Sequence, residues 1–484
     1  MLTITRRQAR RLRSVLRRHT LGIGHRGLVP PLVIGPNPIA GIAVRHRQAA
    51  LAVQCVLPGA HFDDRPVAVP LDALADLEGP DDTPIELEAA APGRTVARWS
   101  DRGIPQVREY AVPEVAGLPP FPGLPEGMEA CPGDLLAALA EAAATTEAGS
   151  ARYALECIQL RGDSGEVVAT DGRQILVQGG FRLPWAGDLL AVAAPLFACR
   201  ELPRDRPAEV GRSEAHVVIR AGAWSVWLAL RPDARFPRVD QLIPAADAPC
   251  TRLRLAAADA EFLAQALDRL PGGDGPCGPV TLDLNGKVAV RARAAAGGPP
   301  TELVLARSAY VGPPTMLSTN RAYLGRAARL GFAELLLAGA GDPVACRDGR
   351  RSYLWQPLSR DSAIGPADDA TRIDSTLPAA VPPPRVGGGE LATVGRGPTG
   401  GRAAGSCPKP SGTVALAGAD RVQASGTGMV ALIQEVVDLH QAMADAKARA
   451  RRLIVSLRRE RKRSRLVQST LATLRQLRLQ GAVE

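Results

Sequence analysis

The sequence lacks several features, and each absence excludes a class of protein. No apolar run in the 484 residues approaches the ~20 that a membrane-spanning helix needs, which excludes a membrane protein. Residues 1–18 have no apolar stretch and no cleavage site, which excludes a secretory signal. The eight cysteines form no Cys-x-x-Cys pair, which excludes a disulfide framework and a zinc knuckle. We therefore expect a soluble, cytoplasmic protein with reduced thiols and no metal site.

Catalytic and cofactor-binding motifs are also missing. There is no G-x-x-x-x-G-K-[ST], H-E-x-x-H or G-x-S-x-G motif, and the six histidines are isolated. A G-x-G-x-x-G pattern begins at Gly22, but it follows a helix and leads into Pro30-Pro31, whereas a dinucleotide site needs a strand before it and a helix after it. We expect no catalytic residue, no cofactor and no enzyme.

The net charge of +10 is concentrated at the two ends of the chain. Residues 1–20 contain seven arginines and no acid, and residues 421–484 contain 13 basic and 5 acidic residues. The residues between them are net acidic. Two localised basic elements point to a polyanionic partner such as nucleic acid.

Helix signals recur through the first 360 residues at intervals of ~125 residues, which indicates an internal repeat. A first helix is expected at Thr5, where Thr5 and Gln8 have the spacing of a capping box. Its counterparts begin near Pro132 and Ala257. Second, shorter helices are expected at Pro70, Pro195 and Asn320, each followed by strand-like runs.

These signals predict an α+β fold with three repeated domains, each made of two helices and antiparallel sheets. The domains are assigned to residues 1–115, 116–245 and 246–360. Residues 361–420 hold 8 Pro and 11 Gly, a composition that cannot form a packed core. We therefore expect a disordered linker over 361–427.

A basic coiled-coil helix is predicted over residues 428–480. Apolar residues follow a 4,3 spacing from Leu432 to Leu474, and a basic run covers Arg458 to Arg465. The helix either self-associates or packs back on the preceding domains.

The first helix has an arginine-rich face. Ala9, Leu12 and Leu16 form the inward stripe. Arg6, Arg10, Arg13 and Arg17 share another face, with Arg7, Arg11 and Arg18 beside them. This face is either a solvated surface or, because no acid of the same helix can pair with these arginines, a site of phosphate contact.

Several segments carry a family resemblance, in the same order and at the same spacing. Ala169-Thr170-Asp171-Gly172 resembles a segment in the middle domain of the bacterial DNA polymerase III β sliding clamp. Arg235-Phe236-Pro237 and Leu242-Ile243-Pro244 are similar to its junction between the second and third domains. Asn320 to Leu324 and Tyr353 to Leu358 resemble its third-domain helix and closing stretch. The resemblance covers about residues 1–360.

The resemblance implies three DNA-clamp domains per chain and a homodimer ring around double-stranded DNA, loaded by a clamp loader. It also implies a pocket in which DNA polymerase and other clamp-binding proteins insert a short peptide. The pocket would involve Leu155, Thr170, Gly172, Arg173, Ile175, Pro244, Leu354, Trp355, Gln356, Pro357 and Leu358. Together with the arginine-rich helix, the candidate DNA-binding residues are Arg6, Arg7, Arg10, Arg11, Arg13, Arg17, Arg26, Arg321, Arg326 and Arg329.

The favoured function is that of a sliding clamp in DNA replication, a non-enzymatic processivity factor associated with the nucleoid. The alternative is an interaction scaffold that keeps the clamp fold, no longer encircles DNA and assembles through its C-terminal coiled coil. Retention on closed circular but not linear DNA would distinguish the two.

Overall fold

The computed structural model describes residues 1–376, apart from 24–28, 40, 59–64, 133, 148–152, 245–248 and 274–276. The chain divides into two units, Met1–Pro384 and Arg385–Glu484. The second unit, which includes most of the expected linker and the whole expected coiled coil, lies outside the described residues.

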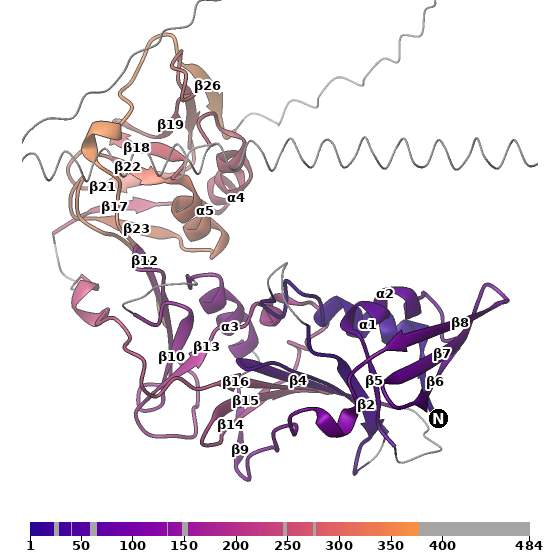
Figure 1. The fold of residues 1–484 in the computed structure, drawn as a ribbon. Helices are drawn as coiled ribbons and strands as arrows, with labels where there is room; N and C mark the ends of the chain where they lie inside the picture. The colour runs from indigo at the N-terminus through magenta and orange to yellow at the C-terminus, as the bar shows by residue number, and fades with distance from the viewer. Residues whose placement is uncertain are drawn as a thin grey trace, which may run out of the picture. The chain divides into compact units, whose positions relative to one another are not determined.

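Four sheets make up most of the described fold (Figure 1). The first sheet has four strands in spatial order: β1 (Leu2–Thr5), β6 (Pro84–Ala91), β7 (Arg94–Asp101) and β8 (Ile104–Ala111). The second has eight: β5 (Val67–Val69), β2 (Leu32–Pro36), β3 (Ile42–Arg47), β4 (Leu51–Leu57), β16 (Trp224–Ala229), β15 (His216–Ala221), β14 (Ala208–Arg212) and β9 (Met128–Cys131).

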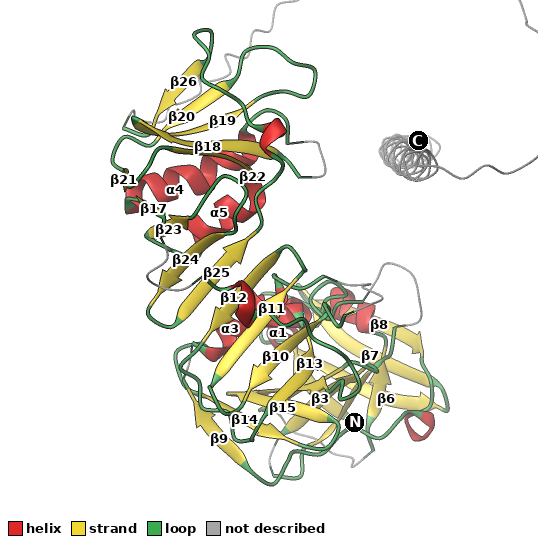
Figure 2. Cartoon of the chain, turned by 90° about the vertical axis from the view of Figure 1, so that its left-hand side faces the viewer, coloured by secondary structure: helices red, strands yellow, loops and turns green. Residues whose placement is uncertain are grey.

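The other two sheets combine strands from the middle and the end of the unit (Figure 2). One has nine strands: β13 (Asp188–Val192), β10 (Cys157–Arg161), β11 (Glu166–Thr170), β12 (Gln174–Gln178), β25 (Arg351–Trp355), β24 (Val344–Asp348), β23 (Glu334–Leu337), β17 (Thr251–Arg254) and β21 (Ala309–Val311). The last has five: β22 (Thr315–Asn320), β18 (Pro279–Asn285), β19 (Lys287–Ala292), β20 (Thr301–Val304) and β26 (Thr371–Asp374).

Helical elements pack in pairs, at the positions that the sequence predicts. The pairs are α1 (Arg6–Val15) with α2 (Leu74–Leu77), α3 (Leu135–Ala143) with the 3₁₀ turn η3 (Pro195–Ala198), and α4 (Ala257–Ala266) with α5 (Arg321–Arg329). The expected capping box is present, because the Thr5 hydroxyl accepts from the N–H of Gln8 and the Gln8 side chain accepts from the N–H of Thr5.

The order of strands repeats along the chain. Each helix pair is accompanied by two groups of four strands. The groups β5-β2-β3-β4, β13-β10-β11-β12 and β22-β18-β19-β20 have the same internal order, as do β1-β6-β7-β8, β9-β14-β15-β16 and β17-β23-β24-β25. The mixed α+β, sheet-rich fold that the sequence predicts is therefore present.

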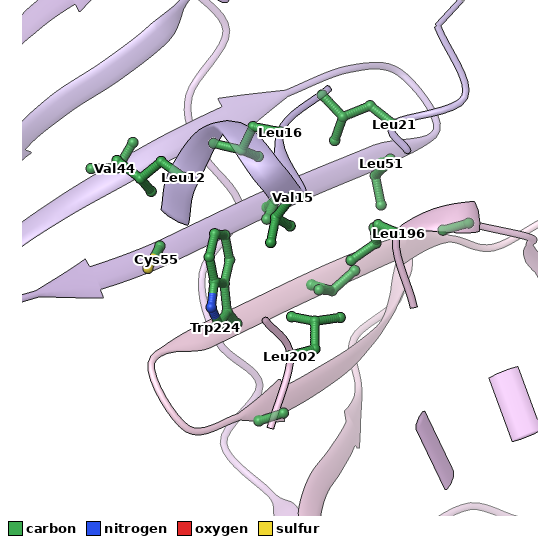
Figure 3. Close-up of a cluster of buried hydrophobic side chains, with 14 of the residues drawn as sticks. Leu12, Val15, Leu16, Leu21, Val44, Leu51, Cys55, Leu196, Leu202 and Trp224 are labelled. Atoms are coloured by element: carbon green, nitrogen blue, oxygen red, sulfur yellow. The ribbon is translucent and has the colours of Figure 1, made fainter. Parts of the chain in front are cut away.

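The core runs continuously across the first two repeats. Leu12 and Val15 of α1, Trp224 of β16 and Leu196 of η3 belong to one cluster of buried side chains (Figure 3). A second cluster fills the space between the last two sheets and helices α4 and α5. Burial of these apolar faces is the main contribution to stability.

One segment differs from its prediction. We expect the linker to begin at residue 361, yet residues 361–376 belong to the described fold and end in β26. The Pro and Gly residues that suggest a linker concentrate after residue 377, whereas Thr371-Arg372-Ile373-Asp374 contains neither. Composition averaged over 60 residues obscured this short strand.

Candidate peptide pocket and basic helix

The turn between β11 and β12 is built by Thr170-Asp171-Gly172. The Thr170 hydroxyl accepts from the N–H of Gly172 at 3.0 Å and donates to the carbonyl of Gln174 at 2.7 Å. One carboxylate oxygen of Asp171 accepts from the N–H groups of Arg173 and Gln174, both at 2.8 Å. Gly172 has φ +87°, a conformation that strains any residue with a Cβ. The motif is therefore a self-contained turn.

Asp171 also links this turn to α5 and β25. Its second carboxylate oxygen accepts from the Gln174 amide at 2.8 Å and from the Tyr323 hydroxyl at 3.3 Å. The Gln174 amide oxygen in turn accepts from the Tyr353 hydroxyl at 2.7 Å. Burial, reinforced by the negative charge of Asp171, raises the pKa of Tyr323 to about 12. Three motifs that are far apart in the sequence thus meet in one hydrogen-bonded network.

A cavity of about 150 Å³ opens beside this network, where β12 pairs with β25. Its floor is apolar, because Ile175, Leu354 and Val239 belong to one small buried cluster. Its lining residues are Thr170, Gly172, Arg173, Ile175, Pro237, Val239, Leu242, Pro343, Leu354, Trp355 and Gln356.

The chain segment 237–244 forms one wall of the cavity. Arg161 holds this segment with two hydrogen bonds to the Asp240 carboxylate, at 2.8 and 3.0 Å, and Arg347 donates to the carbonyl of Pro244. Leu242 remains 54% exposed at the rim. Leu242 therefore adds exposed apolar surface to the rim of the cavity.

Seven of the eleven residues expected at the pocket line this cavity: Thr170, Gly172, Arg173, Ile175, Leu354, Trp355 and Gln356. The indole of Trp355 donates to the Thr319 hydroxyl in the neighbouring core, so Trp355 does not offer its ring to the cavity. The other four, Leu155, Pro244, Pro357 and Leu358, lie outside the lining, although Leu155 packs beneath Gly172.

Sequence reasoning missed four lining residues: Pro237, Val239, Leu242 and Pro343. Pro237 and Leu242 stand in the junction motif itself, so the motif could have identified them. Pro343 reaches the cavity from the turn before β24 and carries no local signal.

The arginines of α1, together with Arg17 just after it, divide into two sets. Arg6 is buried and donates to Asp101 and to the carbonyl of Glu78, while Arg13 pairs with Glu78. These acids come from α2 and the strands after it, a source that inspection of the helix alone could not reveal. Arg6 and Arg13 therefore hold α1 in place.

The exposed set of arginines is Arg7, Arg10, Arg11 and Arg17. Arg7 lies 3.0 Å from the Asp82 carboxylate. In the described part of the chain, no carboxylate lies within 4.0 Å of Arg10, Arg11 or Arg17. Arg10 and Arg11 thus present unpaired positive charge on one side of α1.

The arginines of α5 also differ from one another. Arg321 is buried and donates to the carbonyls of Gly278, Leu267, Leu270 and Pro271. Arg326 donates to the carbonyls of Glu141 and Ala144 at the end of α3. Arg329, with 48% of its side chain exposed, lies 4.0 Å from the exposed carboxylate of Asp268. Arg26 lies outside the described residues.

The described residues match neither of two further patterns, clustered metal ligands and membrane-spanning helices. These residues contain no group of three or more His, Cys, Asp or Glu side chains placed to hold a metal ion. None of their helices is long and apolar enough to cross a membrane.

Comparison of the fold with solved structures identifies bacterial sliding clamps. The DNA polymerase III subunit beta of Pseudomonas aeruginosa, in a structure bound to griselimycin, matches with TM-score 0.59 and 15% identity over 74% of this chain and 98% of that one. The beta subunit of Thermotoga maritima matches with TM-score 0.59 and 12% identity over 74% and 99%. The Bacillus subtilis clamp matches with TM-score 0.58 and 16% identity over 74% and 98%.

Comparison of the amino-acid sequence finds no match, although comparison of the structure does. No family model matches the chain, and no curated protein matches it. The resemblance that short motifs suggest is confirmed at the level of the fold: about three quarters of this chain is built like almost the whole length of a bacterial DNA polymerase III beta sliding clamp.

Proposed function

We propose that this protein is a clamp-like processivity factor, which encircles duplex DNA as a homodimer ring and tethers a DNA polymerase or other DNA-processing proteins. The observation that carries the proposal is the open apolar cavity between β12, β25 and the segment 237–244. It is assembled from the motifs that resemble the clamp family, and the fold around it is the clamp fold. Three domains over residues 1–115, 116–245 and 246–360 are part of the proposal.

The cavity suits a short peptide better than a metabolite. Its floor is apolar, and the polar groups at its rim, Arg173 and Gln356, are exposed. A peptide with one or two apolar side chains would bury them against Leu354 and Leu242, while an acidic neighbour would pair with Arg173. No group in the lining is placed for acid, base or nucleophilic catalysis, which supports a binding role.

The exposed arginines of α1 support contact with DNA. Arg10 and Arg11 carry charge that no described carboxylate neutralises, so phosphate groups can approach without displacing an ion pair. Contacts of this kind are independent of base sequence, as a protein that slides along DNA requires.

The test is topological. The full-length chain is loaded on closed circular duplex DNA with the clamp loader of its own cell, washed in high salt and then challenged by linearising the circle. A ring stays on the closed circle through the wash and leaves when the circle is cut. Equal retention on circular and linear DNA, or none on either, would favour a scaffold that does not encircle DNA.

A further inference from the structure

Strand pairing joins one repeat to the next at equivalent positions. β4 ends the first strand group of its repeat and pairs antiparallel with β16. β12 is the equivalent strand of the second repeat and pairs antiparallel with β25. By the same order, β20 is the equivalent strand in the third repeat, and β8 is the first-repeat equivalent of β16 and β25. The repeated strand order therefore predicts that the outer edge of β20 pairs with a β8 strand.

Within one chain that pair does not form. No described strand pairs with the outer edge of β8, whose residues Ile104 and Val107 are 63% and 66% exposed. The edge of β20 is instead covered by β26, which runs parallel to it and pairs Leu303 with Ile373 (Figure 2). β26 lies beyond the stretch that resembles the clamp family.

Backbone and polar contacts hold β26 and the residue after it in place, including two at Ser375, whose hydroxyl accepts from the N–H of Ala306 at 3.1 Å and whose carbonyl accepts from Arg307 at 3.1 Å. The ladder is framed by the N–H of Thr371 donating to Pro300 at 2.9 Å and that of Ser375 donating to Val304 at 3.0 Å. Arg372 pairs with the buried Glu302 at 3.2 Å, and the Ser375 hydroxyl donates to the buried Asp259 at 2.7 Å. β26 has only four residues, and the first three are exposed. Such a strand contributes backbone hydrogen bonds but little apolar burial.

We propose that β26 is a cis-acting cover that occupies the strand-accepting edge of β20 and must leave before β8 of a second copy can pair there. This inference rests on the proposed homodimer ring. To close such a ring, the β20 edge of each copy must pair with β8 of the other copy. An uncovered edge would invite uncontrolled strand addition, and a short covering strand prevents it until the partner arrives.

The geometry of the two ladders selects the substitutions. Because Thr371 and Ser375 both donate their N–H groups to β20, the N–H of Ile373 also faces β20, and Ile373→Pro removes a hydrogen-bond donor that holds β26. The N–H of Asp374 points away from β20, so Asp374→Pro is the matched control. On β8 the tight turn pairs Asp101 with Ile104, so the N–H of Val107 faces outward and Val107→Pro blocks the free edge alone.

The experiment is sedimentation equilibrium of full-length chains without a loader. All chains carry Leu453→Asp, which removes the apolar seam of the predicted C-terminal coiled coil as a second route to association. Ile373→Pro should tighten self-association about tenfold per interface, the effect of one lost ladder hydrogen bond. Asp374→Pro should leave it unchanged, and adding Val107→Pro to Ile373→Pro should abolish the gain.

Each other outcome overturns the inference. If Ile373→Pro leaves association unchanged, while amide exchange shows that β26 has been released, then β26 does not control this edge. If the gain persists in the Val107→Pro chain, then the association uses another surface. The proposed function is tested separately. If the chains form a β8-dependent dimer that is not retained on circular DNA, the role of β26 is supported and the proposed DNA-encircling function is wrong.

Discussion

At the scale of single residues, arginines of the same helix have different roles. Arg6 and Arg10 are one turn apart on α1, yet Arg6 is 7% exposed and bonded to Asp101, whereas Arg10 is exposed. The helix periodicity predicted the inward stripe of Ala9 and Leu12 correctly. It could not show which arginines are neutralised, because their acidic partners come from residues 72–101.

The first prediction concerns the exposed arginines. Replacing Arg10, Arg11 and Arg17 by Ala should weaken DNA binding and reduce the slope of log affinity against log salt by about 0.9 for each phosphate group that the protein no longer neutralises. The measurement is a salt titration of DNA affinity. A double Arg94→Ala, Arg98→Ala chain is the control, since these two arginines of β7 pair with Glu109 and Glu88. An unchanged slope would remove α1 from the DNA interface.

The second prediction concerns pH. Burial lowers the pKa of His46 to about 4, an effect that the backbone carbonyl of Pro31 partly opposes. The unfolded chain binds a proton near the ordinary histidine pKa, so stability falls as the pH drops below about 6.5 and levels off near the folded value. Between about pH 7 and 5 this amounts to about 2 kcal/mol of unfolding free energy.

Denaturant unfolding at both pH values measures this loss. His46→Gln should reduce the pH dependence. A smaller dependence should remain, because burial also lowers the pKa of His216. If His46→Gln leaves the pH dependence intact, other groups cause it.

At the scale of elements, the pocket depends on contacts between segments that are distant in the chain. The motif Thr170-Asp171-Gly172 fixes its own turn, and this local part was predictable from the sequence. The cavity also needs Val239 and Pro343, which only the folded chain brings to β12 and β25. Short motifs therefore pointed to several residues that line this cavity but not to its full lining.

The third prediction tests the pocket at its rim. Leu242→Asp should weaken binding of a short apolar peptide from the cell's replicative polymerase by at least about tenfold, because a charge would face the apolar cavity. Leu124→Asp is the matched control, since Leu124 is 45% exposed and does not line the cavity. Fluorescence anisotropy of a labelled peptide measures both. Equal affinities would place the peptide elsewhere.

The fourth prediction compares two arginines on α5. The side chain of Arg326 is 12% exposed and donates to the last carbonyls of α3 at 2.6 and 2.7 Å, whereas that of Arg329 is 48% exposed. Arg326→Gln should lower the free energy of unfolding by about 2 kcal/mol, the usual cost of losing hydrogen bonds from a charged group. Arg329→Gln should change it by less than about 0.5 kcal/mol. Similar losses in both variants would contradict this assignment.

At the scale of the whole molecule, the internal repeat was the feature most easily predicted from the sequence, and the strand pairings that join one repeat to the next were the least predictable. Helix starts near Thr5, Pro132 and Ala257 revealed the period of the chain. Nothing in the strand sequences shows that β4 pairs with β16 or β12 with β25, because pairing partners are set by tertiary packing. The C-terminal coiled coil stays a prediction, since residues 428–480 lie outside the described part of the chain.

Because neighbouring repeats share a sheet, they should stay associated even when the chain segment that connects them is cut. The connector of residues 112–127 is largely exposed, so a protease can cut it. The ladder between β4 and β16 and the core shared by Leu12, Leu196 and Trp224 would still bind the two pieces together. A nicked chain should therefore elute from a sizing column as one particle and separate only in denaturant. By the same reasoning, a cell could encode this body as two polypeptides and still assemble it.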